Sequence, residues 1–130
     1  MNTELLCAGV LAFLLFGLGL AVSVERGKAG KLGGVPADEA TRLFRVIRAH
    51  GNAAEYIPVG VAFALFFAIA GSSVIVTAIL VAFTASRIIH AVALIVGASM
   101  DRFDVARFLG GMGTYLTGFA LSIALIARAI

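Results

Sequence analysis

Four long apolar segments, each close to the thickness of a bilayer when helical, constrain the fold of this chain more than any other feature. They cover residues 5–24, 53–70, 73–98 and 105–127. A membrane-spanning helix needs about 20 mostly apolar residues, whereas barrel strands would alternate apolar and polar residues. We therefore predict an all-α membrane protein, with residues 1–130 forming a single domain that folds as an antiparallel bundle of four transmembrane helices.

Composition supports a lipid environment. The chain is 62% hydrophobic and 13% charged, against about 45–50% and 25% in soluble domains. A small globule has too little interior to hide that excess. The net charge of +3 does not indicate nucleic-acid binding, because the basic residues gather in one loop and at helix ends, as membrane topology predicts.

Basic residues are placed asymmetrically along the chain. The connection after the first span and the start of the second helix hold Arg26, Lys28, Lys31, Arg42, Arg45 and Arg48. The third connection adds Arg102, and the turn at residues 71–72 carries no charge. By the positive-inside rule, both charged connections are predicted to be cytoplasmic and both termini external.

The second helix is predicted to begin before the membrane. Pro36 suits a helix start, and Asp38 and Glu39 favour the positive end of a helix dipole. We expect a loop over residues 25–36, a helical extension over residues 37–52 beginning near Ala37, and a kink at Pro58, whose ring removes one backbone hydrogen bond.

Ionisable residues inside spans are costly and indicate function. On helix two, Arg48, Asn52 and Glu55 share one face at spacings of i, i+4 and i+7. On helix three, Arg87 and His90 share a face at i and i+3. Two structural alternatives remain open: an Arg87–Glu55 ion pair that only joins helices, and a His90 that only packs.

Arg107, near the start of helix four, completes this polar set, although it could simply extend to the membrane surface. In an antiparallel bundle, the start of span two, the end of span three and the start of span four lie at one depth. The set is therefore predicted to form one site in the cytoplasmic leaflet. Its arginines suit carboxylates and a thiolate, and Glu55 suits an ammonium group. A peptide with two carboxylates, an amine and a thiol fits, and no metal is expected, since His90 has no second ligand at suitable spacing.

The run from Arg48 to Pro58, Arg-Ala-His-Gly-Asn-Ala-Ala-Glu-Tyr-Ile-Pro, resembles a signature of the MAPEG family, the membrane-associated proteins in eicosanoid and glutathione metabolism. Chain length, four spans and a basic first loop are also similar. The Arg87-to-His90 step and the position of Arg107 resemble family features on helices three and four. The chain looks most like microsomal glutathione transferase members of bacterial type.

The resemblance implies a homotrimer that binds glutathione between subunits in its cytoplasmic half, together with a hydrophobic or lipid-like co-substrate from the membrane. The glutathione-binding residues that it implies are Arg48, Asn52, Glu55, Tyr56, Arg87 and His90. Arg107 would stabilise the thiolate, with Arg26 from a neighbouring subunit as the second choice.

Two positions differ from parts of the family. Several members have a tyrosine where this chain has Leu94, and the prostaglandin synthase branch has a serine where it has Phe108. The resemblance therefore implies a generic glutathione transferase or peroxidase acting on a hydrophobic electrophile or lipid hydroperoxide. The alternatives are a non-catalytic membrane binding protein for a lipid or anionic ligand, and a small transporter that uses Glu55 as its coupling carboxylate.

Overall fold

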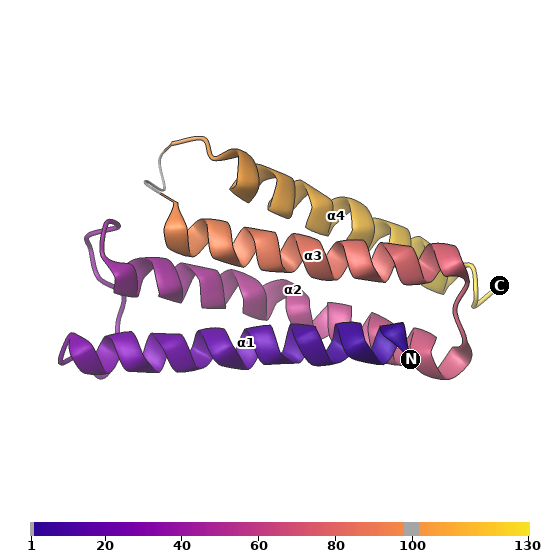
Figure 1. Ribbon diagram of the computed structural model, residues 1–130, viewed down its shortest axis with the longest axis horizontal. Helices are drawn as coiled ribbons and strands as arrows, with labels where there is room; N and C mark the ends of the chain where they lie inside the picture. The colour runs from indigo at the N-terminus through magenta and orange to yellow at the C-terminus, as the bar shows by residue number, and fades with distance from the viewer. Residues whose placement is uncertain (1, 98–101) are drawn as a thin grey trace.

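The computed structural model describes residues 2–97 and 102–130 and consists there of four helices joined by short connections. They are α1 (Thr3–Lys28), α2 (Arg42–Ala70), α3 (Val74–Val96) and α4 (Val105–Ile126). Each is long and apolar enough to cross a membrane. Figure 1 shows them running antiparallel, with both termini at one end of the bundle and the α1–α2 and α3–α4 connections at the other. The predicted four-helix membrane fold is confirmed, and residue 98 of the predicted third span lies outside the described residues.

A side chain caps the first turn of every helix. These N-caps are Asn2, Thr41, Ser73 and Asp104, each of which accepts a hydrogen bond from a backbone N–H three residues later. Such caps satisfy donors that the helix itself leaves without partners. The helix starts are therefore fixed by local chemistry as well as by hydrophobicity.

The predicted start of helix two near Ala37 is wrong, because residues 37–41 form a turn and the helix begins at Arg42. The carboxylate of Asp38 accepts the Ala40 N–H at 2.9 Å, and the Thr41 hydroxyl donates to the Asp38 carbonyl at 2.8 Å. These side-chain bonds stabilise a turn in place of a helix. Because α1 also continues to Lys28, the non-helical connection covers residues 29–41 rather than 25–36.

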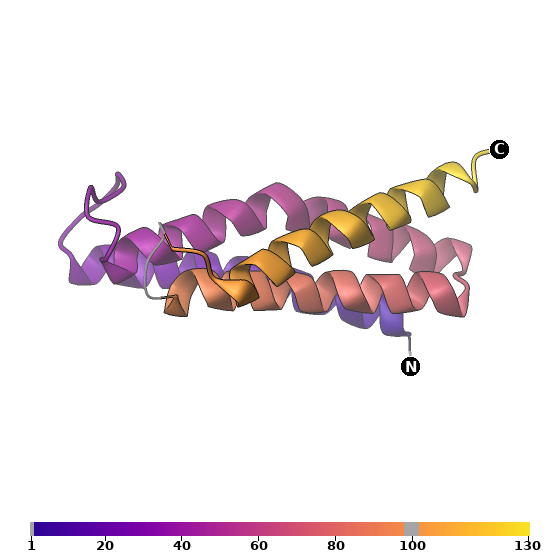
Figure 2. The ribbon, with the colours of Figure 1, turned by 90° about the horizontal axis from the view of Figure 1, so that it is seen from above.

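The helices pack in chain order. α1 lies along α2, α2 along α3 and α3 along α4, while α1 also touches α3. Within the described chain, α4 packs extensively against α3 alone, and Figure 2 shows it crossing the bundle obliquely. The core between the other helices is apolar and includes Leu11, Ile57, Phe67 and Leu80, all at most 1% exposed.

The backbone of α2 stays helical through Pro58. Figure 2 shows α2 changing direction near its middle, as expected for a proline inside a helix. The bend carries the second half of α2 back toward α3, where Gly60 faces the ring of Phe83.

Polar contacts close the end of the bundle that carries the termini. Glu4 on α1 accepts hydrogen bonds from the hydroxyls of Ser72 and Thr77, each at 2.5 Å. Arg128 donates to the carbonyls of Ala70, the last residue of α2, and of Gly71, in the α2–α3 turn. This end is therefore tied together by side chains from α1, α3 and the C-terminal segment.

Candidate functional site

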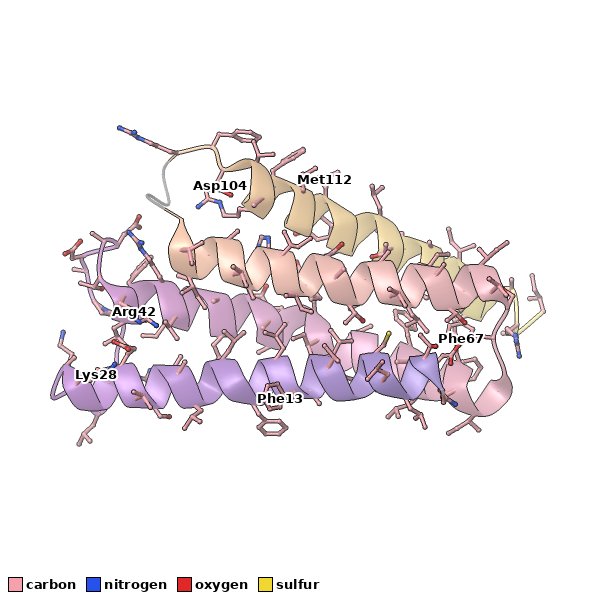
Figure 3. The ribbon with its side chains drawn as sticks, viewed as in Figure 1. Phe13, Lys28, Arg42, Phe67, Asp104 and Met112 are labelled. Atoms are coloured by element: carbon pink, nitrogen blue, oxygen red, sulfur yellow. The ribbon has the colours of Figure 1, made fainter. Side chains whose placement is uncertain are left out.

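A polar cavity of about 700 Å³ lies toward the loop end of the bundle, between α2, α3, α4 and the α1–α2 connection. Its polar lining residues are Glu39, Arg48, Asn52, Glu55, His90 and Arg107. Figure 3 shows this end of the bundle, where Arg42 and Asp104 mark the starts of α2 and α4. The volume lies in the usual range for small-molecule sites.

The cavity brings together five of the eight residues that the sequence predicted for the site. Arg48, Asn52 and Glu55 reach it from successive turns of α2, as their spacing predicted. His90 comes from α3 and Arg107 from the first turn of α4. The antiparallel arrangement therefore places these side chains at one depth.

Arg87 lies behind the cavity wall and is 1% exposed. Its Nη2 donates to the Oδ1 of Asn52 at 2.6 Å, and its Nη1 donates to the Oγ1 of Thr114 at 3.2 Å. Its Nε has no hydrogen-bond partner. Within residues 2–97 and 102–130 no ion pair joins Arg87 to Glu55, so the structural alternative of an Arg87–Glu55 bridge is wrong.

The bond from Arg87 fixes the orientation of Asn52. Because the side-chain carbonyl of Asn52 accepts from a cation, its amide group is left to donate on the cavity side. Glu55, by contrast, is exposed. The cavity wall on α2 thus offers a cation, an amide donor and a carboxylate in sequence.

The ring of His90 is oriented by α4. Its Nδ1 lies 2.9 Å from the carbonyl oxygen of Arg107, and a carbonyl only accepts, so Nδ1 carries the proton in the neutral ring and Nε2 is an acceptor. The backbones approach closely at this point because Gly110 has no side chain. A Cβ there would lie 2.6 Å from the backbone nitrogen of His90.

Arg107 lies at the cavity edge nearest the α3–α4 connection. Its backbone N–H donates to the carboxylate of Asp104 at 2.7 Å, and its Nη2 donates to the carbonyl of Arg102 at 2.5 Å. The cap therefore fixes the backbone of Arg107, and the loop carbonyl holds one side of its guanidinium. The cation stands at the boundary between the cavity and the loop.

Tyr56 does not line the cavity but lies one helical turn deeper than Asn52. Its hydroxyl is 3.0 Å from that of Tyr115 on α4, and the two rings meet edge to face. The Arg87 guanidinium stands 5.2 Å from the centre of the Tyr56 ring. Sequence reasoning missed Tyr115, and its position about two helical turns after Arg107 was the available signal.

Arg26 is not among the residues that line the cavity. It lies near the end of α1, where Glu25 pairs with Lys28 at 2.8 Å and with Arg42 at 3.2 Å. The pair with Arg42 joins the end of α1 to the start of α2. The role of Arg26 toward a neighbouring subunit stays a prediction.

Among the described side chains, no three His, Cys, Asp or Glu residues stand close enough to hold a metal ion. The cavity instead contains groups that recognise an organic ion: guanidinium groups, a carboxylate, an amide and an imidazole. Guanidinium groups bind carboxylates and thiolates, and carboxylates bind ammonium groups.

The sequence was compared with models of known protein families. The model described as "MAPEG family" matches residues 5–127, nearly the whole chain. The chain belongs to the MAPEG family. It is thus a multi-pass membrane protein of a family associated with glutathione and eicosanoid metabolism. No curated protein matches the chain.

Proposed function

We propose that this MAPEG protein is a glutathione-dependent membrane enzyme, of transferase or peroxidase type, which binds glutathione as a thiolate and directs it at a hydrophobic electrophile or lipid hydroperoxide. The supporting observation is the polar cavity at the loop end, which lies between three helices that are each long and apolar enough to cross a membrane. Charged groups in such surroundings are costly unless a partner or a ligand balances them.

The charges of the site suit an anionic peptide. Arg48 and Arg107 line the cavity and Arg87 stands behind it, while Glu39 and Glu55 are the carboxylates of the lining. Three cations and two anions leave one positive charge. Glutathione, with two carboxylates and one ammonium group, has one net negative charge while its thiol is protonated.

Each polar group then has a partner of matching chemistry. Glu55 binds the ammonium group, and Arg48 and the amide of Asn52 bind carboxylate. Arg107 stands near the sulfur and favours the thiolate over the thiol, whose pKa is ordinarily about 8.5. His90 borders the same space with the Nε2 acceptor that its tautomer provides.

A binding experiment tests the proposal directly. Glutathione is added to purified protein at neutral pH, and thiolate absorbance and melting temperature are followed, with S-methylglutathione as the control that lacks a thiol. We expect both ligands to raise the melting temperature, because binding stabilises the folded state, and only glutathione to add thiolate absorbance. No stabilisation by millimolar glutathione would disprove the proposal.

The role of Arg107 has a matched control in Arg102. Arg107→Ala should abolish the thiolate absorbance and turnover while the protein keeps its fold. Arg102→Ala removes an exposed arginine of the same loop and keeps the backbone carbonyl that contacts Arg107, so it should preserve both signals. Equal losses in the two variants would remove Arg107 from the mechanism.

One observation favours a second candidate function, a non-catalytic protein that binds a lipid or another anionic ligand in the same cavity. Leu94, 7% exposed, lines the cavity with an apolar side chain at a place where several family members carry a tyrosine. Glutathione binding without thiolate formation or turnover, across a panel of electrophiles and hydroperoxides, would favour this candidate over the enzyme.

We further propose that the loop end faces the cytoplasm and that three copies assemble, bringing Arg26 of a neighbouring subunit to the cavity. Support comes from the basic residues of the two connections, which lie together at the end opposite the termini. The orientation is tested with the variant Gly30→Cys, which places a thiol in the α1–α2 connection. Labelling of that thiol by a membrane-impermeant maleimide added outside sealed cells would contradict a cytoplasmic loop. The mass of the purified complex reports the number of copies.

A further inference from the structure

The hydroxyl pair of Tyr56 and Tyr115 joins two helices that otherwise barely meet. α4 packs along α3 and, in the described chain, makes no extensive contact with α2. The two phenol oxygens lie 3.0 Å apart across that gap. Two hydroxyls have two hydrogens, and only one can lie between the oxygens. The second hydrogen must point elsewhere, and neither hydroxyl has another hydrogen-bond partner in the part of the chain that the structure describes.

The surroundings of this spare donor are apolar. Tyr115 is 48% exposed, and Met112, Leu116 and Phe119 on the same helix are 40%, 64% and 69% exposed. In a spanning helix, such a surface meets lipid or another apolar chain rather than water. An O–H group without an acceptor in apolar surroundings is energetically unfavourable. A ligand oxygen arriving from the membrane would supply that acceptor.

The pair is also close to the polar cavity and to a cation. Tyr56 follows Asn52 by four residues, which places it about 6 Å further along α2 and on the same face. The Arg87 guanidinium stands 5.2 Å from the Tyr56 ring centre and donates to Asn52 in the cavity wall. The pair therefore stands next to the polar groups that line the cavity, on the side away from the loops.

We propose that Tyr56 and Tyr115 donate the hydrogen bond that binds and polarises an acceptor oxygen on the hydrophobic co-substrate. The preferred substrate class is then a membrane-soluble α,β-unsaturated carbonyl compound. This inference rests on the proposed glutathione-dependent function and deepens it. The cavity holds the thiolate, and the tyrosine pair, one turn deeper, holds the oxygen of the molecule that the thiolate attacks.

The reaction balances without any further reagent. The thiolate sulfur forms a bond to the β-carbon of the unsaturated carbonyl compound, and the electrons of the carbon–carbon double bond shift to give an enolate. The tyrosine O–H stabilises the negative charge that develops on the enolate oxygen. The proton that the thiol released on binding is returned by solvent to the α-carbon. The product is the thioether with its carbonyl restored.

The kinetic test compares two electrophiles of equal chain length, a long-chain enone and a long-chain alkyl iodide that has no oxygen. We expect Tyr115→Phe and Tyr56→Phe each to lower kcat/KM for the enone about tenfold, with little change for the iodide. The double variant should lose less than the product of the two single losses, since the pair donates one hydrogen bond. Phe119→Leu, on the same exposed side of α4, is the control and should leave the ratio of the two substrates unchanged. Equal losses for both substrates, or no loss, would overturn the proposal.

A second readout requires no glutathione. A saturated long-chain ketone cannot react, and its carbonyl stretching frequency falls when a hydrogen bond forms. We expect a lowered frequency with the wild-type protein and the unperturbed value with the double tyrosine variant. A lowered frequency in a protein that fails to bind glutathione would refute the proposed function and retain the oxygen site. An unperturbed frequency with the wild type would refute the oxygen site alone.

Discussion

The guanidinium of Arg87 and the side-chain carbonyl of Asn52 lie 2.6 Å apart across the interface of α3 and α2. Arg87 does not line the cavity itself, yet it determines which atoms Asn52 presents there. The same guanidinium reaches Thr114 on α4 at 3.2 Å. One buried cation therefore links three helices and orients a cavity residue, so fold and site depend on a shared set of bonds.

Arg87→Met separates these two roles. Because the described chain provides no carboxylate partner and leaves Nε unbonded, we expect the ligand-free protein to become more stable, by about 1–4 kcal/mol. Thr114 keeps its bond to the carbonyl of Gly110. Asn52 loses its orientation, so glutathione affinity should fall about tenfold, or ~1.4 kcal/mol. Thermal unfolding and titration calorimetry measure the two effects, and a less stable variant with normal affinity would contradict the argument.

Glu55→Gln tests the ammonium partner. Glu55 is exposed, so the free energy of unfolding should change by less than about 0.5 kcal/mol. Glutathione affinity should fall about 10- to 100-fold, because a hydrogen bond to a charged group contributes about 1.5–3 kcal/mol. A glutathione analogue without the amine should bind both proteins equally. Glu25→Gln, which removes a carboxylate paired with Lys28 and Arg42 away from the cavity, should leave the affinity unchanged.

Gly110→Ala tests the close approach of α3 and α4. The added Cβ would lie 2.6 Å from the backbone nitrogen of His90, so the helices must separate at an expected loss of about 1–3 kcal/mol of stability. Gly17→Ala on α1, where nothing lies within 4 Å, is the matched control and should stay within about 0.5 kcal/mol of wild type. The unfolding temperatures of the two variants provide the comparison. Equal stability would mean that α3 and α4 are not in contact there.

The hydrogen bonds of Glu4 with Ser72 and Thr77, at the end of the bundle that carries the termini, should stabilise the fold without affecting the cavity. Glu4→Gln and Thr77→Val each remove part of the Glu4–Thr77 hydrogen bond. We expect each to destabilise the protein by about 1 kcal/mol, with the double variant less destabilised than the sum, since the two side chains share one interaction. Unfolding of the four proteins gives the coupling. Altered glutathione affinity in any of them would show that the two ends are connected.

Much of the fold could be predicted because only helices and closed barrels satisfy the backbone hydrogen bonds of a chain that crosses a bilayer. The four spans follow from apolar length alone, and the bounds of α1, α3 and α4 and the end of α2 differ from them by at most four residues. The start of α2 could not be predicted in the same way. Asp38 and Thr41 are both good caps, and choosing between them depends on a local competition of hydrogen bonds that hydrophobicity does not reveal.

The site, like the fold, could be predicted only in part. The spacing of Arg48, Asn52 and Glu55 predicted their shared face, and antiparallel topology predicted that His90 and Arg107 would join them. The partner of Arg87 could not be predicted, because Asn52 and Glu55 lie within one turn and a small rotation of α2 decides between them. Tyr115 was missed because periodicity counts it as one more apolar residue, and its use depends on the hydroxyl.

Because α4 packs extensively against α3 alone in the described chain, one of its sides is exposed, and this affects how a hydrophobic reactant reaches the protein. The exposed residues Leu116 and Phe119 of α4 are apolar. We therefore expect an oily reactant to approach α4 by lateral diffusion in the bilayer without entering water. Its effective concentration is then its mole fraction in the bilayer. Adding inert lipid at constant protein should dilute such a reactant and slow its turnover, even though the amount per litre of sample is unchanged.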